Sequence, residues 1–239
     1  MESRNDSATG LSDAELALHL AGGTLAAWKA VESPQTSGGE LFGAPSDAWE
    51  QARLAAASQG RHMARRGGRA LEPGREAHPT AVAARFEALR QPAALAEQRR
   101  RLADFGVRLV AWRDPSYPPD LLQLPQPPLA LAVQGRWPPP ADALAMVGSR
   151  AATTYGLRVA RRAGRCAATA GLAVVSGLAR GIDKAALEGA EEGGGWPLAV
   201  LGCGLDIAYP PQNRALQERI ARRGTLVSEF ALGQRPDRW

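Results

Sequence analysis

The sequence predicts an α/β protein in which a parallel, Rossmann-like sheet follows a small all-helical region. From residue 143 onward, buried strand patterns alternate with amphipathic helix patterns, and glycine-containing turns follow the strands. Residues 11–105, by contrast, show helical spacing and no strand pattern. We therefore divide the chain into a helical domain at 1–105, connecting strands with a proline-rich linker at 106–142, and a Rossmann-like domain at 143–239.

The first region is rich in Ala, Leu, Arg and Glu, and three or four helices fit its periodicity. Ser12 begins a capping-box pattern, and glycine and proline clusters at 33–39 and 67–79 supply loops. Short apolar stretches broken by prolines follow. They predict strands at 107–112 and 129–133 and a linker at 138–140.

The last region reads as repeated strand–helix units, which imply right-handed crossovers between parallel strands. The predicted strands are 144–147, 172–175, 197–201 and 225–227, and the predicted helices are 154–170, 184–192 and 213–222. We place Asp183 and Asn213 at N-cap positions of the last two helices.

The net charge of the chain is +5, and its location is informative. Residues 143–239 contain 13 basic and 8 acidic side chains, whereas residues 1–142 contain 16 of each. The excess in the last region suggests a polyanionic partner. The polar N-terminus and the lack of a long apolar run lead us to expect a soluble, cytoplasmic protein.

Enzymatic and metal chemistry have little support in the sequence. Cys166 and Cys203 lack metal-ligand spacing, so we predict no metal site and interpret both as small buried side chains in a reducing compartment. Residues 143–239 contain no histidine, and their carboxylates are few. We predict no catalytic residue and no cofactor.

Two of the predicted strand-to-helix turns, 148–150 and 176–181, carry a small residue and an arginine but no carboxylate. In a parallel sheet both turns lie at the carboxyl ends of the strands, where main-chain N–H groups and helix dipoles suit anions. The glycine spacing of a dinucleotide site fails, since Ile207 stands where a third glycine is needed. The P-loop spacing around Lys184 fails as well. A phosphate or nucleic-acid site remains.

Four arginines, at 158, 161, 162 and 165, cover one broad face of the helix predicted at 154–170. We interpret this face as solvated, with contact to DNA or protein as the alternative.

Four segments together resemble the DNA-processing protein A family (DprA, also called Smf): MVGSRAATTYG, VVSGLARGIDKAALEGA, AVLGCGLDIAYPPQN and TLVSEF. The resemblance extends from about residue 107 to 236. It implies that the first region is a SAM-like helical domain. It also implies a homodimeric single-stranded DNA-binding protein that protects incoming DNA in natural transformation and loads RecA recombinase.

Carried over by motif, the two arginine-bearing turns would hold backbone phosphate, and the segment at 202–213 would line the pocket with a tyrosine available to a base. The implied DNA-binding residues are Gly148, Ser149, Arg150, Ser176, Gly177, Arg180, Gly181, Lys184, Gly202, Gly204, Tyr209 and Asn213.

The sequence departs from the family pattern at two places. The family usually has a histidine in the helix after Gly-Ile-Asp, where this chain reads AALEGA. The family also continues beyond the Ser-Glu turn into a segment like F-P-x-R-N-R, whereas this chain stops at Trp239. We expect a truncated product, and the alternative is a shorter variant completed by another chain.

The competing function is a nucleotide-binding enzyme or sensor of the lysine-decarboxylase-like Rossmann class. That class resembles P-G-G-x-G-T at its catalytic turn, which the Gly-Gly-Gly-Trp sequence at 193–196 does not match.

Overall fold

A computed structural model of the chain describes residues 11, 16, 17, 19, 20, 22, 88, 89 and 91–236. Most of the predicted helical region, with its Ser12 cap and its SAM-like character, lies outside these residues. The described residues fall into two compact units. One comprises 104–108 and 132–236, and the other comprises 109–131 with the described residues up to 103.

In the unit that contains 109–131, helix α5 and a tyrosine contribute buried side chains. Helix α5 (Pro92–Asp104) buries Leu95 and Leu102, which are seven residues apart and therefore lie on one face. Tyr117 is buried, and its hydroxyl donates a hydrogen bond to the Pro128 carbonyl at 2.8 Å. This bond satisfies the one polar group that the aromatic side chain brings into the interior.

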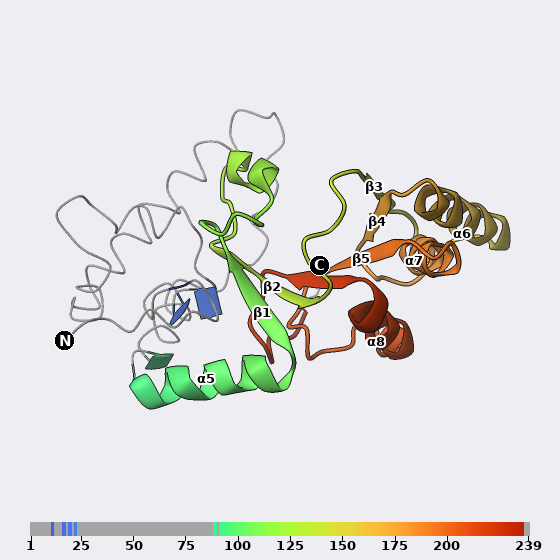
Figure 1. The fold of residues 1–239 in the computed structure, drawn as a ribbon. Coiled ribbons are helices and arrows are strands. Elements are labelled where there is room, and N and C mark those ends of the chain that lie inside the picture. The colour runs from blue at the N-terminus through green and yellow to red at the C-terminus, as the bar shows by residue number, and fades with distance from the viewer. Residues whose placement is uncertain are drawn as a thin grey trace, which may run out of the picture. The chain divides into compact units, whose positions relative to one another are not determined.

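One six-stranded sheet has the order β1-β2-β6-β5-β4-β3 (Figure 1). Every strand lies within two residues, at each end, of the strand predicted from the sequence. The bounds are β1 Val107–Ala111, β2 Ala130–Gly135, β3 Ala143–Ala145, β4 Ala173–Ser176, β5 Trp196–Leu201 and β6 Thr225–Ser228.

The predicted parallel sheet is confirmed for β3 to β6. Their register aligns Ala145 with Val175, Val175 with Leu198, and Leu198 with Thr225. Strand β2 differs, because it pairs with β6 in antiparallel orientation. The sequence predicts β2 only as a connecting strand, whereas in the structure it joins the sheet and satisfies the main-chain groups along the second edge of β6.

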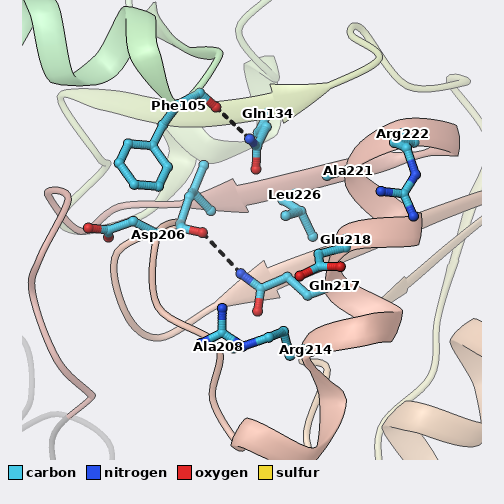
Figure 2. A pocket seen from close by; sticks show the side chains of 11 residues that line it. Phe105, Gln134, Asp206, Ala208, Arg214, Gln217, Glu218, Ala221, Arg222 and Leu226 are labelled. Carbon is cyan, nitrogen blue, oxygen red and sulfur yellow. Dashed lines mark hydrogen bonds between the residues drawn. The ribbon is translucent and has the colours of Figure 1, made fainter.

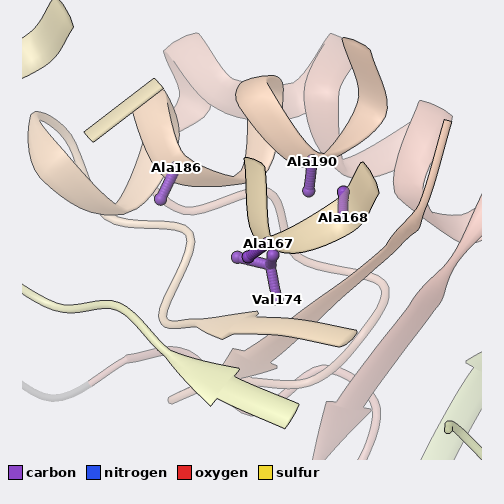
Figure 3. Close-up of a cluster of buried hydrophobic side chains, with 5 residues drawn as sticks. All are labelled: Ala167, Ala168, Val174, Ala186 and Ala190. Atoms are coloured by element: carbon purple, nitrogen blue, oxygen red, sulfur yellow. The ribbon is translucent and has the colours of Figure 1, made fainter. Parts of the chain in front are cut away.

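Helices α6 (Thr154–Thr169), α7 (Ile182–Glu192) and α8 (Arg214–Arg223) connect the parallel strands and lie on the same face of the sheet (Figure 1). This arrangement follows because consecutive strands step across the sheet in one direction and crossovers share one hand. Figure 3 shows the core between the sheet and helices α6 and α7. In this core, alanines of the two helices meet Val174 of β4.

Helices α6 and α7 approach each other closely because glycines stand at their contact. A Cβ atom on Gly164 of α6 would overlap the carbonyl oxygen of Ala186, and one on Gly189 of α7 would overlap that of Arg161. The close approach fixes the position of α7 against α6. Because α7 begins at one of the two arginine-bearing turns, the position of that turn is fixed as well.

The helix N-termini correct one of the two N-cap predictions and confirm the position of the other. Gly181, not Asp183, is the N-cap of α7, with φ 80° and ψ −127°, and Asp183 lies buried in the first turn. Asn213 does occupy the N-cap of α8, but its side chain makes no capping hydrogen bond. Only the N-terminus of α6 has a side-chain cap among these three, with Thr153 Oγ1 accepting from Gly156 N at 3.1 Å.

The cysteine interpretation holds for Cys203, which is buried, and is wrong for Cys166, which is exposed on α6. Among the described residues no helix is long and apolar enough to cross a membrane.

Candidate nucleic-acid interface

The turn after β3, residues 147–151, is exposed along its whole length. Ser149 shapes it, because its Oγ accepts a hydrogen bond from the Ala151 N–H at 3.1 Å. The Arg150 side chain makes no ion pair with any residue that the structure describes. The turn therefore presents a guanidinium group to solvent without a competing carboxylate.

The turn after β4, residues 177–181, has an unusual main-chain conformation. Leu178 has a positive φ of 55° and is fully buried, and Gly181 has a φ of 80°. At Gly177 a Cβ atom would lie 2.9 Å from the Asp183 carboxylate, so a side chain there would crowd that group. With Leu178 turned into the core, Arg180 is left exposed at the surface.

The two turns are in direct contact. The Ile182 N–H donates to the Ser149 carbonyl at 3.2 Å, and a Cβ atom on Gly181 would overlap that same carbonyl oxygen. Below them, Ser176 Oγ donates to the Met146 carbonyl at 2.6 Å. We call residues 147–151 and 177–181 the paired turns, since these contacts make them one surface.

The buried side chain of Asn213 is hydrogen-bonded to the turn at 177–181. Its Nδ2 donates to the carbonyl oxygens of Leu178 at 2.8 Å and Ala179 at 3.3 Å, and the residue is only 2% exposed. The amide thus links the start of α8 to a turn 34 residues earlier. Nothing in the local sequence pattern indicates this role.

The glycine turn after β5, residues 202–204, is less exposed than the turn at 147–151. Gly204 is buried, and its N–H donates to the Gln234 carbonyl at 2.8 Å. Ser228 Oγ donates to the Cys203 carbonyl at 2.8 Å. Burial, and to a lesser extent the charge of Asp206, raises the pKa of the Cys203 thiol, so the thiol stays protonated and is a poor nucleophile near neutral pH.

The predicted DNA-binding residues thus differ in access to solvent. Exposed are Gly148, Ser149, Arg150, Gly177, Arg180, Gly202 and Tyr209; half-buried are Gly181 and Lys184; buried are Ser176, Gly204 and Asn213. Lys184 Nζ lies 3.7 Å from the Glu188 carboxylate, which offsets part of its charge. As DNA contacts, all twelve residues stay predictions.

The paired turns are suited to bind phosphate. They offer two unpaired guanidinium groups and main-chain N–H groups at the start of α7, and the nearest acidic side chain in sequence, Asp183, is buried. In the part of the chain that the structure describes, no group of three His, Cys, Asp or Glu side chains could hold a metal ion.

A pocket of about 340 Å³ lies beside α8 (Figure 2). Gln217 shapes it by donating from Nε2 to the Leu205 carbonyl at 3.0 Å. Two arginines and two acids line it, namely Arg214, Arg222, Asp206 and Glu218. Since these charges cancel, the pocket suits a polyanion less well than the paired turns do.

The glycines at 193–195, relevant to the competing nucleotide-enzyme function, lie between α7 and β5, at the amino end of that strand. A Cβ atom on Gly195 would lie 2.5 Å from the Cβ of Ala168. This turn is therefore packed against α6, at the edge of the sheet opposite the paired turns.

The comparisons with known proteins agree with the family resemblance. The family model described as DNA recombination-mediator protein A matches residues 108–239, more than half of the chain. The chain is 40% identical to Protein Smf of Synechocystis over 130 residues, which is 52% of this chain and 33% of that protein. It is 36% identical to DNA processing protein DprA of Streptococcus pneumoniae over 128 residues, 52% of this chain and 44% of that protein.

A crystal structure of DNA processing protein A from Streptococcus pneumoniae shares the fold. It aligns with a TM-score of 0.64 at 23% sequence identity, over 95% of this chain and 71% of that chain. In sequence, the chain spans less than half the length of these two curated relatives.

Proposed function

The chain belongs to the DNA recombination-mediator protein A family, and on that premise we propose that it binds single-stranded DNA at the paired turns. One observation carries the proposal. Arg150 and Arg180 stand exposed on turns that contact each other, and neither has an acidic partner among the described residues. Phosphate groups of a nucleic-acid backbone would supply the missing counter-charge.

An exposed aromatic ring after the next strand favours a single strand over a duplex. Backbone phosphates are common to both, whereas stacking on a protein ring needs an unpaired base. Tyr209 follows the next parallel strand of the sheet and is 52% exposed, so its ring is available for stacking with an unpaired base. Because the chain has few aromatic side chains, its affinity for the single strand comes mostly from charge and falls steeply as the salt concentration rises.

In this proposal the buried members of the predicted set position the surface. Ser176 and Asn213 bond main-chain carbonyls, and Gly204 packs beside the segment at 231–234. Direct contact with phosphate falls to the exposed members, above all Ser149, Arg150 and Arg180.

We further propose the role that the family resemblance implies. In that role the protein is a homodimer that binds DNA without catalysis, protects incoming DNA in natural transformation and passes it to RecA recombinase. This role concerns the whole protein. Size-exclusion chromatography of the chain with and without a single strand tests the dimer, and the rate at which RecA displaces a bound single-strand-binding protein tests the loading.

The binding proposal is tested by titrating the chain with labelled oligo-dT and with a duplex of equal length at several salt concentrations. We expect the single strand to bind more tightly, and the double substitution Arg150→Ala with Arg180→Ala to weaken it strongly. Arg222→Ala with Arg223→Ala removes the same charge at the other end of α8 and serves as control. Equal binding of single strand and duplex, or an unchanged affinity in the first variant, contradicts the proposal.

A further inference from the structure

We propose that the outward face of α6 continues the nucleic-acid surface of the paired turns, so that a longer single strand runs along Arg158 and Arg162. The inference rests on the proposed function and deepens it, because it assigns a second group of contacts and a longer binding site.

The face is defined by the packing of α6. The side that meets the sheet and α7 buries Ala160, Gly164, Ala167 and Ala168. At 3.6 residues per turn, the positions 155, 158, 159 and 162 fall within an arc of about 100° on the opposite side. Tyr155 is 70% exposed and Val159 is 48% exposed there, and Arg158 and Arg162 are exposed on the same face.

Only part of the basic character of α6 is neutralised within the protein. Arg161 lies toward α7, where its Nε donates to the Glu192 carboxylate at 2.8 Å. The pKa of Glu192 is lowered mainly by this hydrogen bond and further by the charge of Arg165, so both of these arginines act on one carboxylate. Arg161 therefore belongs to the contact between the two helices, and Arg165 acts on the same carboxylate through its charge alone.

Arg158 and Arg162 are in a different position. Neither has an ion pair or hydrogen bond with any residue in the described part of the chain. They are four residues apart on one helix, so their like charges are neighbours and repel. A chain of phosphate groups laid across both would offset this repulsion.

The occupant follows from the charge and from continuity with the paired turns. Helix α6 begins at Thr154, just past Arg150, and the stretch from Tyr155 to Arg162 covers about 10 Å along its axis. An exposed ring beside spaced arginines is the combination that single-strand binders use, stacking bases while the cations follow the backbone. The strand that leaves Arg150 therefore meets Tyr155 first and the two arginines next.

The test uses the full chain with Arg158→Gln and Arg162→Gln combined, titrated with oligo-dT of about three and about twenty nucleotides. The shorter strand has phosphates enough for Arg150 and Arg180 alone, so only the longer strand can fill both surfaces. Removing two phosphate contacts lowers the salt slope for that strand by about 1.4. Raising salt from 50 to 200 mM then weakens wild-type binding about sevenfold more than it weakens the variant. Binding of the short strand stays as in wild type.

Two controls accompany this variant. Arg222→Gln with Arg223→Gln removes equal charge at the end of α8 and is expected to leave the slope for the long strand close to wild type. Tyr155→Ala is expected to weaken the long strand about fivefold or more through lost stacking, and Tyr155→Phe to retain its affinity. All of these side chains are exposed, so urea unfolding midpoints equal to wild type verify that the variants fold.

An unchanged affinity and salt slope for the long strand in the α6 variant overturns the inference, and so does an equal loss in the α8 control. If the short strand still depends on Arg150 and Arg180 in that case, the proposed function stands and only the α6 path is wrong. If the wild-type chain binds neither strand, both fail together.

Discussion

Replacing Asn213 by alanine tests how the second turn is held. The substitution removes hydrogen bonds of 2.8 and 3.3 Å to the Leu178 and Ala179 carbonyls. Because Leu178 is fully buried, its carbonyl is left without a donor in a place that water reaches poorly. A buried acceptor in that state costs about 1 to 3 kcal/mol. We expect the free energy of unfolding to fall by about 2 kcal/mol.

Urea unfolding followed by circular dichroism measures this change. With a urea dependence of about 2 kcal/mol per molar for a domain of ordinary size, the midpoint should fall by about 1 M. Gln212→Ala is the matched control, because it shortens an exposed amide side chain at the neighbouring position. The single strand should also bind the Asn213 variant less tightly, since Arg180 stands on the loosened turn. A variant with the wild-type midpoint and affinity refutes the role given to Asn213.

Three further predictions concern other parts of the fold. Gly189→Ala would place a methyl group against the Arg161 carbonyl and force α6 and α7 apart, lowering the free energy of unfolding by about 1 to 3 kcal/mol, whereas Gly202→Ala, with open space around it, should be nearly neutral in the same urea titration. Gly181→Ala would meet both the Ser149 carbonyl and a main-chain conformation that L-residues avoid, and should weaken single-strand binding together with stability; retained affinity would argue against the close approach of the paired turns. His19 is buried, and burial lowers its pKa from 6.5 to about 4. The unfolded chain therefore takes up a proton around pH 6.5 that the folded unit does not, so stability is constant above about pH 7.5 and falls by about 2 kcal/mol between pH 7.5 and 5. A His19→Leu variant should lose this part of the pH dependence, and an identical pH profile in both proteins would contradict the burial of His19.

The strands and helices from 107 onward could be predicted from the sequence because their patterns are local. A buried strand between turn residues, or an amphipathic stretch after a cap, carries its own signal in five to fifteen residues. The two arginine-bearing turns follow in the same way, because any turn after a parallel strand lies at the carboxyl edge of the sheet.

Features set by contacts between distant segments could not be predicted. The sequence pattern places Asn213 at a helix start but does not indicate that topology brings the Leu178 carbonyl within reach of its amide. It likewise gives no reason for β2 to add to β6 in antiparallel orientation. The exposure of Cys166, by contrast, could have been predicted, because Cys166 follows Arg162 by four residues and therefore lies on the arginine-bearing face of α6, away from the buried Ala160, Gly164, Ala167 and Ala168.

The most direct test of the central claim is a map of main-chain amide NMR shifts as oligo-dT is added to the isotope-labelled chain. The largest changes should appear at Ser149 to Ala151 and at Gly177 to Ile182. The amides of the glycine turn at 193–195, at the amino edge of the sheet, should not move. Changes concentrated in that glycine turn, or around the pocket beside α8, would contradict the assignment of DNA binding to the paired turns.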